Sequence, residues 1–287
     1  MKIYNYSKQK ITKLDLKEVN KSLLRNSLSR GPTINIFEKK LKLFTKSKYA
    51  IAVNNGTSAL ILAVNSLKLK KNSLIAVPNI TFIATANAPL LAGHRVVLLD
   101  VNKDTGLVEL KSIKKQFYKS KIDCFINVHL NGNIGELKDI FNFCKSKKIR
   151  VIDDACHALG TEYKINKKAY NICDNKYCDI STLSFHPTKL ITTGEGGAFL
   201  TNDKEINDRA RKIMNHGYEK SFIQSGNYKH SYYKIVTPGY NFRISDINCS
   251  LGIGQINNIK NKISHRRKIA LFYDNYFKDN EYVDTLI

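Results

Sequence analysis

Short apolar runs alternate with segments of helical periodicity through most of the chain. The apolar runs lie at 50–53, 74–77, 96–99, 122–128, 150–154 and 179–185. Segments in which apolar residues recur every three or four positions follow them, from about residue 57, from about 81, near 109 and over 135–147. Continuous apolar strands separated by helices are typical of a parallel sheet covered on both faces. The pattern therefore predicts an α/β fold with a mostly parallel central sheet.

Helical periodicity also marks both ends of the chain. Residues 14–28 and 34–46 are predicted to be helices, because Gly-Pro at 31–32 breaks the pattern between them. Residues 244–278 also read as helical. Gly252 and Gly254 are expected to be weak points of that segment, since glycine has a low helix propensity.

A lysine and an aspartate are expected at neighbouring strand ends. Lys189 lies in the segment 184–197, SFHPTKLITTGEGG, and the run 150–154 ends in Asp153 and Asp154. Adjacent strand residues face opposite sides, so only one of the two carboxylates can point into a shared site. A pyridoxal phosphate (PLP) enzyme needs a lysine for the Schiff base and an aspartate to keep the pyridine nitrogen protonated. Because sites in open α/β sheets form at the carboxyl ends of strands, the pattern predicts a PLP-dependent aminotransferase.

Small and hydroxylated residues follow the first predicted strand. Gly56, Thr57 and Ser58 stand at an expected helix start, where backbone N–H groups and hydroxyls can hold a phosphate. The alternative is an ordinary helix cap, since Thr and Ser favour that position anyway. Ser184, near the lysine, is a further candidate for the cofactor phosphate.

Two ring-bearing residues are weaker candidates. Phe82, in PNITF, follows the second predicted strand and is placed to stack on a cofactor ring, although an aromatic there is more often part of the core. His157 follows Asp154 by three residues, so a helical turn would put the two side chains together. Lone histidines are usually structural, and the combination with Asp154 favours function.

Charge and composition exclude some other classes. The 287 residues carry a net charge of +23, from 47 Lys and Arg against 24 Asp and Glu, but the lysines are spread over the whole chain. This distribution indicates a solvated surface that can steer anionic substrates, not a nucleic-acid interface. The six cysteines lack the spacing of a metal site, so free thiols and no bound metal are expected.

The sequence also argues against a membrane-spanning or secreted protein. No apolar run approaches the roughly 20 residues that span a bilayer. The N-terminus, MKIYNYSKQK, lacks the apolar core of a signal peptide. We therefore expect a cytoplasmic protein.

Six motifs in order resemble those of the DegT/DnrJ/EryC1/StrS sugar aminotransferases, which have the PLP fold type I. They are NNGTSA at 54–59, PNITFIATAN at 78–87, VIDDACHALG at 151–160, SFHPTKLITTGEGG at 184–197, NHG at 215–217 and GYNFRISDI at 239–247. The resemblance runs from Tyr6 to Ile287. Within the family, YSKQ near the start and PNITF look most like the UDP-sugar transaminases of pseudaminic acid synthesis.

The resemblance implies a role for each candidate residue. Lys189 would hold the cofactor and Asp154 would pair with the pyridine nitrogen, which makes these two the catalytic residues. The other cofactor contacts would be Gly56, Thr57, Ser58 and Ser184 around the phosphate, Phe82 and His157 near the ring, and Asn241 at the phosphate of the other subunit. Asn241 thus implies a homodimer with shared active sites.

The resemblance also implies a reaction. An amino group would move from L-glutamate to C4 of a UDP-linked 4-keto-6-deoxy-N-acetylhexosamine. Related dehydratases carry histidine in place of the lysine, so Lys189 favours transamination. The alternatives are a 3- or 4-aminotransferase acting on a dTDP or GDP sugar, a PLP-binding protein without turnover, and, last, a nucleic-acid-binding protein.

Family members continue beyond the position of Ile287 into a C-terminal small domain. The expected division is therefore an N-terminal helical segment at 1–33, a PLP-binding large domain at 34–250, and at 251–287 the start of a truncated C-terminal region.

Overall fold

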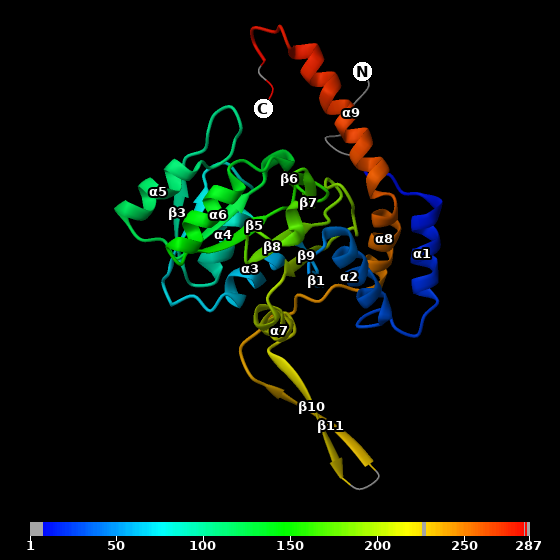
Figure 1. Ribbon diagram of the computed structural model, residues 1–287. Helices are drawn as coiled ribbons and strands as arrows, with labels where there is room; N and C mark the ends of the chain where they lie inside the picture. Colours follow the sequence, from blue (N-terminus) through cyan, green and yellow to red (C-terminus); the bar gives the residue numbers. More distant parts are fainter. Residues whose placement is uncertain (1–7, 226–227, 284, 286–287) are drawn as a thin grey trace.

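A seven-stranded sheet forms the centre of the computed structural model, which describes residues 8–225, 228–283 and 285 (Figure 1). Its strands, in the order in which they lie side by side, are β1 (Tyr49–Val53), β9 (Gly197–Thr201), β8 (Ile180–Ser184), β5 (Arg150–Asp154), β4 (Cys124–Val128), β2 (Leu74–Pro78) and β3 (Arg95–Leu99). All neighbouring pairs from β8 to β3 are parallel, whereas β9 is antiparallel to both β8 and β1. The predicted mostly parallel sheet is confirmed, and β9 is an addition to it.

Helices cover both faces of this sheet. The helices of the described chain are α1 (Lys13–Leu23), α2 (Pro32–Thr45), α3 (Gly56–Ser66), α4 (Ala84–Leu91), α5 (Leu110–Lys119), α6 (Leu137–Ser146), α7 (Lys204–Ile213), α8 (Asp246–Asn257) and α9 (Ile259–Phe277), of which α1 packs on α8 and α9 projects from the body. Ile51 and Val53 of β1 belong to the buried cluster that contains α3, α4 and α7. Ala50 and Ala52, which point the other way, belong to the cluster that contains α2 and α8. Strands buried on both faces explain why their sequences are continuously apolar.

The antiparallel strand β9 brings two distant ends together. Val53, the last residue of β1, pairs with Gly197, and Gly197 also pairs with Ser184, the last residue of β8. The carboxyl ends of β1 and β8 therefore lie at one edge of the sheet, and Asp154 at the end of β5 lies at the same edge.

The glycines of α8 are points of close packing between helices, and the expectation that they weaken the helix stays a prediction. A Cβ atom at Gly252 would lie 2.6 Å from the Phe37 ring of α2, and one at Gly254 would lie 2.3 Å from Asp15 Oδ1 of α1. The Gln255 side chain donates to the same Asp15 carboxylate at 2.7 Å. Absent side chains therefore allow α1 and α2 to pack closely on an unbroken α8.

Two elements project from the body of the molecule in opposite directions (Figure 1). One is the hairpin of β10 (Tyr218–Ser225) and β11 (Tyr228–Ile235), and the other is α9. A smaller hairpin, β6 (Glu162–Ile165) with β7 (Lys168–Asn171), and the short 3-10 helices Leu130–Gly132 and Ile172–Asp174 complete the fold. Of the helices in the described part of the chain, none combines the length and the apolar character needed to cross a bilayer. The predicted domain boundary at residue 250 falls inside α8, and the division into domains stays a prediction.

Candidate active site

The segment that carries Lys189 is a closed loop between β8 and β9. Phe185 N donates to the carbonyl of Gly196 at 2.8 Å, and Thr193 N donates back to the carbonyl of Phe185 at 3.0 Å. Lys189 N bonds the carbonyl of His186 at 2.9 Å, so the lysine lies in a tight turn. The half-buried lysine side chain is thus presented at the carboxyl edge of the sheet.

Asp154 is held at the end of β5 with only 6% of its surface exposed. Its Oδ2 accepts from Thr85 Oγ1 at 2.9 Å, and its Oδ1 accepts from Cys156 N at 3.2 Å. Thr85 lies within the PNITFIATAN motif, in the first turn of α4, so this motif supplies the residue that orients the aspartate. Because both oxygens are engaged, the carboxylate has a defined direction.

The neighbouring Asp153 has a different partner. Its Oδ1 lies 3.3 Å from Nε2 of His129, and both side chains are fully buried. Burial is the largest single influence and lowers the pKa of His129, but the charge and hydrogen bond of Asp153, the backbone of Asn133 and the charge of Asp154 together raise the pKa above its ordinary value. The two aspartates therefore face separate surroundings, as the alternation along a strand predicts.

His157 lies within electrostatic reach of both Lys189 and Asp154. Its pKa is lowered, first by burial and then by the positive charge of Lys189, while Asp154 acts in the opposite direction. Asn131 N approaches its Nδ1 at 3.5 Å. The lowered pKa keeps the imidazole neutral at pH 7.

The first turn of α3 lies directly against the end of β8. A Cβ atom at Gly56 would be 2.8 Å from Cβ of Ser184, so glycine is required for this approach. Asn55 caps the helix by accepting from Ser58 N at 2.7 Å, which corrects the alternative that Thr57 or Ser58 is the cap. The backbone N–H groups of Gly56 and Thr57 have no partner within the helix.

A cavity of about 240 Å³ brings Lys189, His157 and Ser184 together, whereas Asp154 and the first turn of α3 are not part of its lining. It is lined by Asn131, Cys156, His157, Leu159, Ser184, Thr188, Lys189, Leu190, Ile191 and Arg266. Arg266 of α9 was not predicted, and its Nη2 donates to the carbonyls of Thr188 and Lys189, both at 3.3 Å. Burial, followed by the charge of Asp154, raises the pKa of the Cys156 thiol well above its usual range, so this thiol stays protonated beside Lys189.

Phe82 and Asn241 lie outside the lining of this cavity as the structure describes it. The Phe82 side chain is 74% exposed, which corrects the alternative that it belongs to the core. The Phe82 carbonyl accepts a hydrogen bond from Thr85 N at 3.0 Å, and Thr85 is the residue that orients Asp154. Asn241 is exposed and bridges to Asn215 through the backbone. Their roles toward a cofactor stay predictions.

A second cavity, of about 280 Å³, adjoins Lys189 on the side of α9. Its lining includes the positively charged or titratable side chains of Lys8, Lys10, Lys189, Lys262, His265 and Arg266. All six cysteines are free thiols. Within the described ranges, no three His, Cys, Asp or Glu side chains gather as a metal site would require.

Similar proteins were found at both the sequence and the structure level. A transaminase from Campylobacter jejuni subsp. jejuni serotype O:23/36 (strain 81-176), named UDP-4-amino-4,6-dideoxy-N-acetyl-beta-L-altrosamine transaminase, is 36% identical over 283 residues, which are 98% of this chain and 71% of that protein. Helicobacter pylori PseC, an aminotransferase of pseudaminic acid biosynthesis, superposes with a TM-score of 0.87 at 29% identity and covers 98% of this chain and 72% of that one.

A third similar protein catalyses a different reaction. The E. coli GDP-4-keto-6-deoxy-D-mannose-3-dehydratase with bound hydrated PLP superposes with a TM-score of 0.86 at 26% identity, covering 98% of this chain and 74% of that one. Residues 9–286, nearly the whole chain, match the sequence pattern of one protein family. The chain belongs to the DegT/DnrJ/EryC1/StrS aminotransferase family.

Proposed function

We propose that this protein is a PLP-dependent aminotransferase that moves an amino group from L-glutamate to C4 of a UDP-linked 4-keto-6-deoxy-N-acetylhexosamine. The observation that carries the proposal is the meeting of Lys189, Asp154 and the first turn of α3 at one edge of the sheet. The named Campylobacter and Helicobacter transaminases support the sugar and the position on it.

The residues present fit PLP. The first turn of α3, where the N–H groups of Gly56 and Thr57 have no partner within the helix, packs closely against Ser184, and together they make a donor set suited to a phosphate. A buried, oriented carboxylate at Asp154 suits the protonated nitrogen of a pyridine ring. Gly56, Thr57, Ser58 and Ser184 would hold the phosphate, with Phe82 and His157 near the ring.

Each of these side chains has a separate role in the proposed reaction, which follows from its chemistry. Bound PLP supplies an electron sink for the electron pair left when the carbon next to the amino nitrogen loses its proton. The Lys189 amine would anchor the cofactor, carry the proton from Cα of the donor to the cofactor carbon that receives the amino group, and in the second half of the reaction carry a proton from that carbon to C4 of the sugar. Asp154 keeps a proton on the ring nitrogen, and the neutral His157 adds no positive charge beside it.

The cavity on the side of α9 supports an anionic substrate. Lys8, Lys10, Lys262 and Arg266 line it next to Lys189, and a nucleotide diphosphate would offset their mutual repulsion. We also propose a homodimer in which the exposed Asn241 reaches the partner's cofactor phosphate. The free thiols suit the reducing cytoplasm, which is the proposed location.

The test is amino transfer by purified protein supplied with PLP, L-glutamate and a UDP-linked 4-keto sugar. We expect the absorbance of the bound cofactor to change on addition of glutamate, and 2-oxoglutarate and an amino sugar to form in equal amounts. Matched reactions with dTDP and GDP keto-sugars serve as controls. A preference for either control would contradict the assigned nucleotide, and no turnover of any sugar would contradict the proposed activity.

A further inference from the structure

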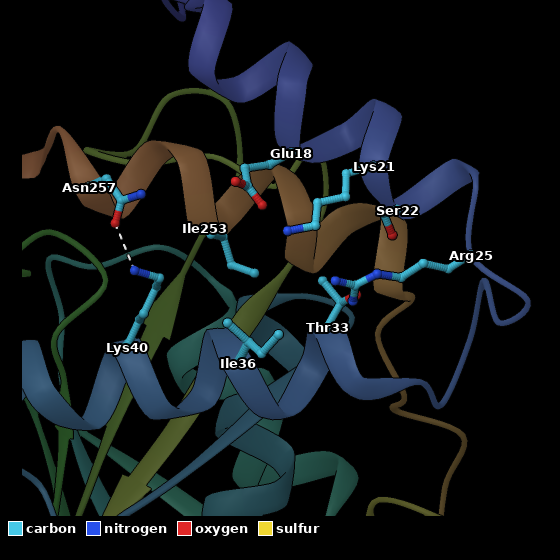
Figure 2. Close-up of a pocket in the computed structure, with 9 residues that line it drawn as sticks. All are labelled: Glu18, Lys21, Ser22, Arg25, Thr33, Ile36, Lys40, Ile253 and Asn257. Atoms are coloured by element: carbon cyan, nitrogen blue, oxygen red, sulfur yellow. Dashed lines mark hydrogen bonds between the residues drawn. The ribbon is translucent and has the colours of Figure 1, made fainter.

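A cavity away from Lys189 lies between α1, α2 and α8 (Figure 2). Its volume is about 210 Å³. Its lining residues are Glu18, Lys21, Ser22, Arg25, Thr33, Ile36, Lys40, Ile253 and Asn257. None of them belongs to the candidate active site, so the cavity requires an explanation of its own.

Positive charge predominates in this lining. Lys21 and Arg25 approach from the end of α1, and Lys40 approaches from α2 (Figure 2). Arg25 Nη1 donates to Thr33 Oγ1 at 2.8 Å, and Lys40 Nζ donates to Asn257 Oδ1 at 2.9 Å. Both partners are neutral, so these bonds position the two cations without cancelling their charge. Glu18 is the single acidic side chain of the lining.

Ser22 supplies a second, independent observation. Its side chain is 2% exposed, and its hydroxyl makes no hydrogen bond with any described residue. Figure 2 shows the hydroxyl directed from α1 toward the space above Arg25 and Thr33. A buried hydroxyl without a partner is unfavourable, because it has lost its water and gained nothing in exchange. A ligand with an acceptor oxygen would satisfy it.

We propose that this cavity binds the phosphate group of a small molecule. Ser22 would donate one hydrogen bond to a phosphate oxygen, and Lys21, Arg25 and Lys40 would balance its charge. The volume decides the size of the ligand, because pockets for drug-sized molecules measure roughly 300–1,000 Å³. The cavity therefore suits inorganic phosphate or a short phosphate ester, with Ile36 and Ile253 beside the carbon atoms of the ester.

The first experiment is calorimetric titration of the PLP-saturated protein with inorganic phosphate in a phosphate-free buffer of low ionic strength. Saturation with PLP occupies the phosphate position proposed at α3. We expect saturable binding that includes a site whose affinity falls at least tenfold in Lys21→Met. Lys39→Met is the matched control, because Lys39 is an exposed residue of α2 that does not line the cavity. Equal losses in the two variants, or no saturable binding, would overturn the proposal.

Ser22→Ala gives a test that is independent of charge. Removing an unpaired buried hydroxyl should leave the melting temperature in phosphate-free buffer unchanged or higher. The same variant should lose most of the rise in melting temperature that phosphate produces in the wild type, since ligand stabilisation follows affinity. A Ser22→Ala protein that binds phosphate with wild-type affinity would show that the hydroxyl does not face the ligand and would overturn the proposal.

Discussion

The carboxyl edge of the sheet and the projecting helix α9 differ in how far their side chains are buried. At the edge, Asp154 is buried and both of its oxygens are hydrogen-bonded. On α9, large apolar side chains face solvent, with Phe272 64% and Tyr276 70% exposed. The edge is therefore fixed by contacts within one chain, whereas the exposed side chains of α9 contribute little to the stability of that chain. Arg266, on α9 but bonded to the Lys189 loop, connects the two regions.

The sharpest test of the edge is Lys189→Ala. We expect amino transfer to fall by about 10³-fold or more, because both the anchor for the cofactor and the proton carrier are lost. The fold should persist, since the loop is closed by backbone bonds of Phe185, Gly196 and Thr193. Turnover and the circular dichroism spectrum are the measurements. Lys204→Ala, on the surface of α7, is the control. Wild-type turnover in the Lys189 variant would refute the assignment.

Gly56→Ala tests how closely the edge is packed. The added Cβ would meet Ser184 Cβ at 2.8 Å, so we expect the free energy of unfolding to drop by about 1–3 kcal/mol. Affinity for PLP should fall with it, because α3 must move away from β8. Urea unfolding and PLP titration measure the two effects. The double variant Gly56→Ala/Ser184→Gly should recover stability, and additive losses would argue against the contact.

Arg266→Leu breaks the link between the two regions. The loss of two bonds to the Thr188 and Lys189 carbonyls should slow turnover about threefold to tenfold, corresponding to about 1 kcal/mol. Removing this positive charge should also raise the pKa of His157, which Arg266 helps to lower. The pKa should still lie below its ordinary value, because burial is its largest cause and is retained.

An NMR titration of His157 follows this change, and Arg267→Leu, one residue further along α9, is the matched control. In the Arg266 variant, the imidazole should become protonated at a higher pH than in the wild type. An unchanged titration would mean that α9 does not influence the site.

The smallest effect is expected on α9 itself. Phe272→Ser should alter the free energy of unfolding by no more than about 0.5 kcal/mol, because the ring is mostly in water. By contrast, Phe199→Ala in β9, where the ring is fully buried, should cost about 3–5 kcal/mol. Chemical unfolding of both variants at low protein concentration provides the comparison. A large loss in the Phe272 variant would remove the distinction between the two regions.

The alternation of strands and helices could be predicted from the sequence because each parallel strand is buried on both faces. The strand β9 escaped prediction, since the glycine-rich turn before it was read only as part of the Lys189 motif. The hairpin of β6 and β7 was missed as well. Its signal was present in the polar Asn166-Lys167 pair, both in the left-handed region with φ of 47° and 66°, which is typical of a tight hairpin turn.

Three lining residues of the cavity at Lys189 were predicted from the sequence, whereas two residues that hold the site in place, Thr85 and Arg266, were not. Lys189, Ser184 and His157 line one cavity because the motifs that carry them end neighbouring strands. Thr85 was within reach of the same reasoning, since it stands in the motif of Phe82 and one turn beyond it. Arg266 was not, because it lies 77 residues from Lys189 on a helix whose approach only the tertiary structure determines.

The strand β9 has a consequence for the order in which the protein is made. Strand β1 is an edge strand that pairs only with β9 within the described sheet. It therefore cannot join the sheet until residues 197–201 have left the ribosome. At about 5–20 residues per second, β1 waits on the order of ten seconds for this partner. Strands β2 to β5 can pair with one another in that time. The first turn of α3 thus meets Ser184 late, and the nascent chain acquires its sheet before it acquires a place for the cofactor.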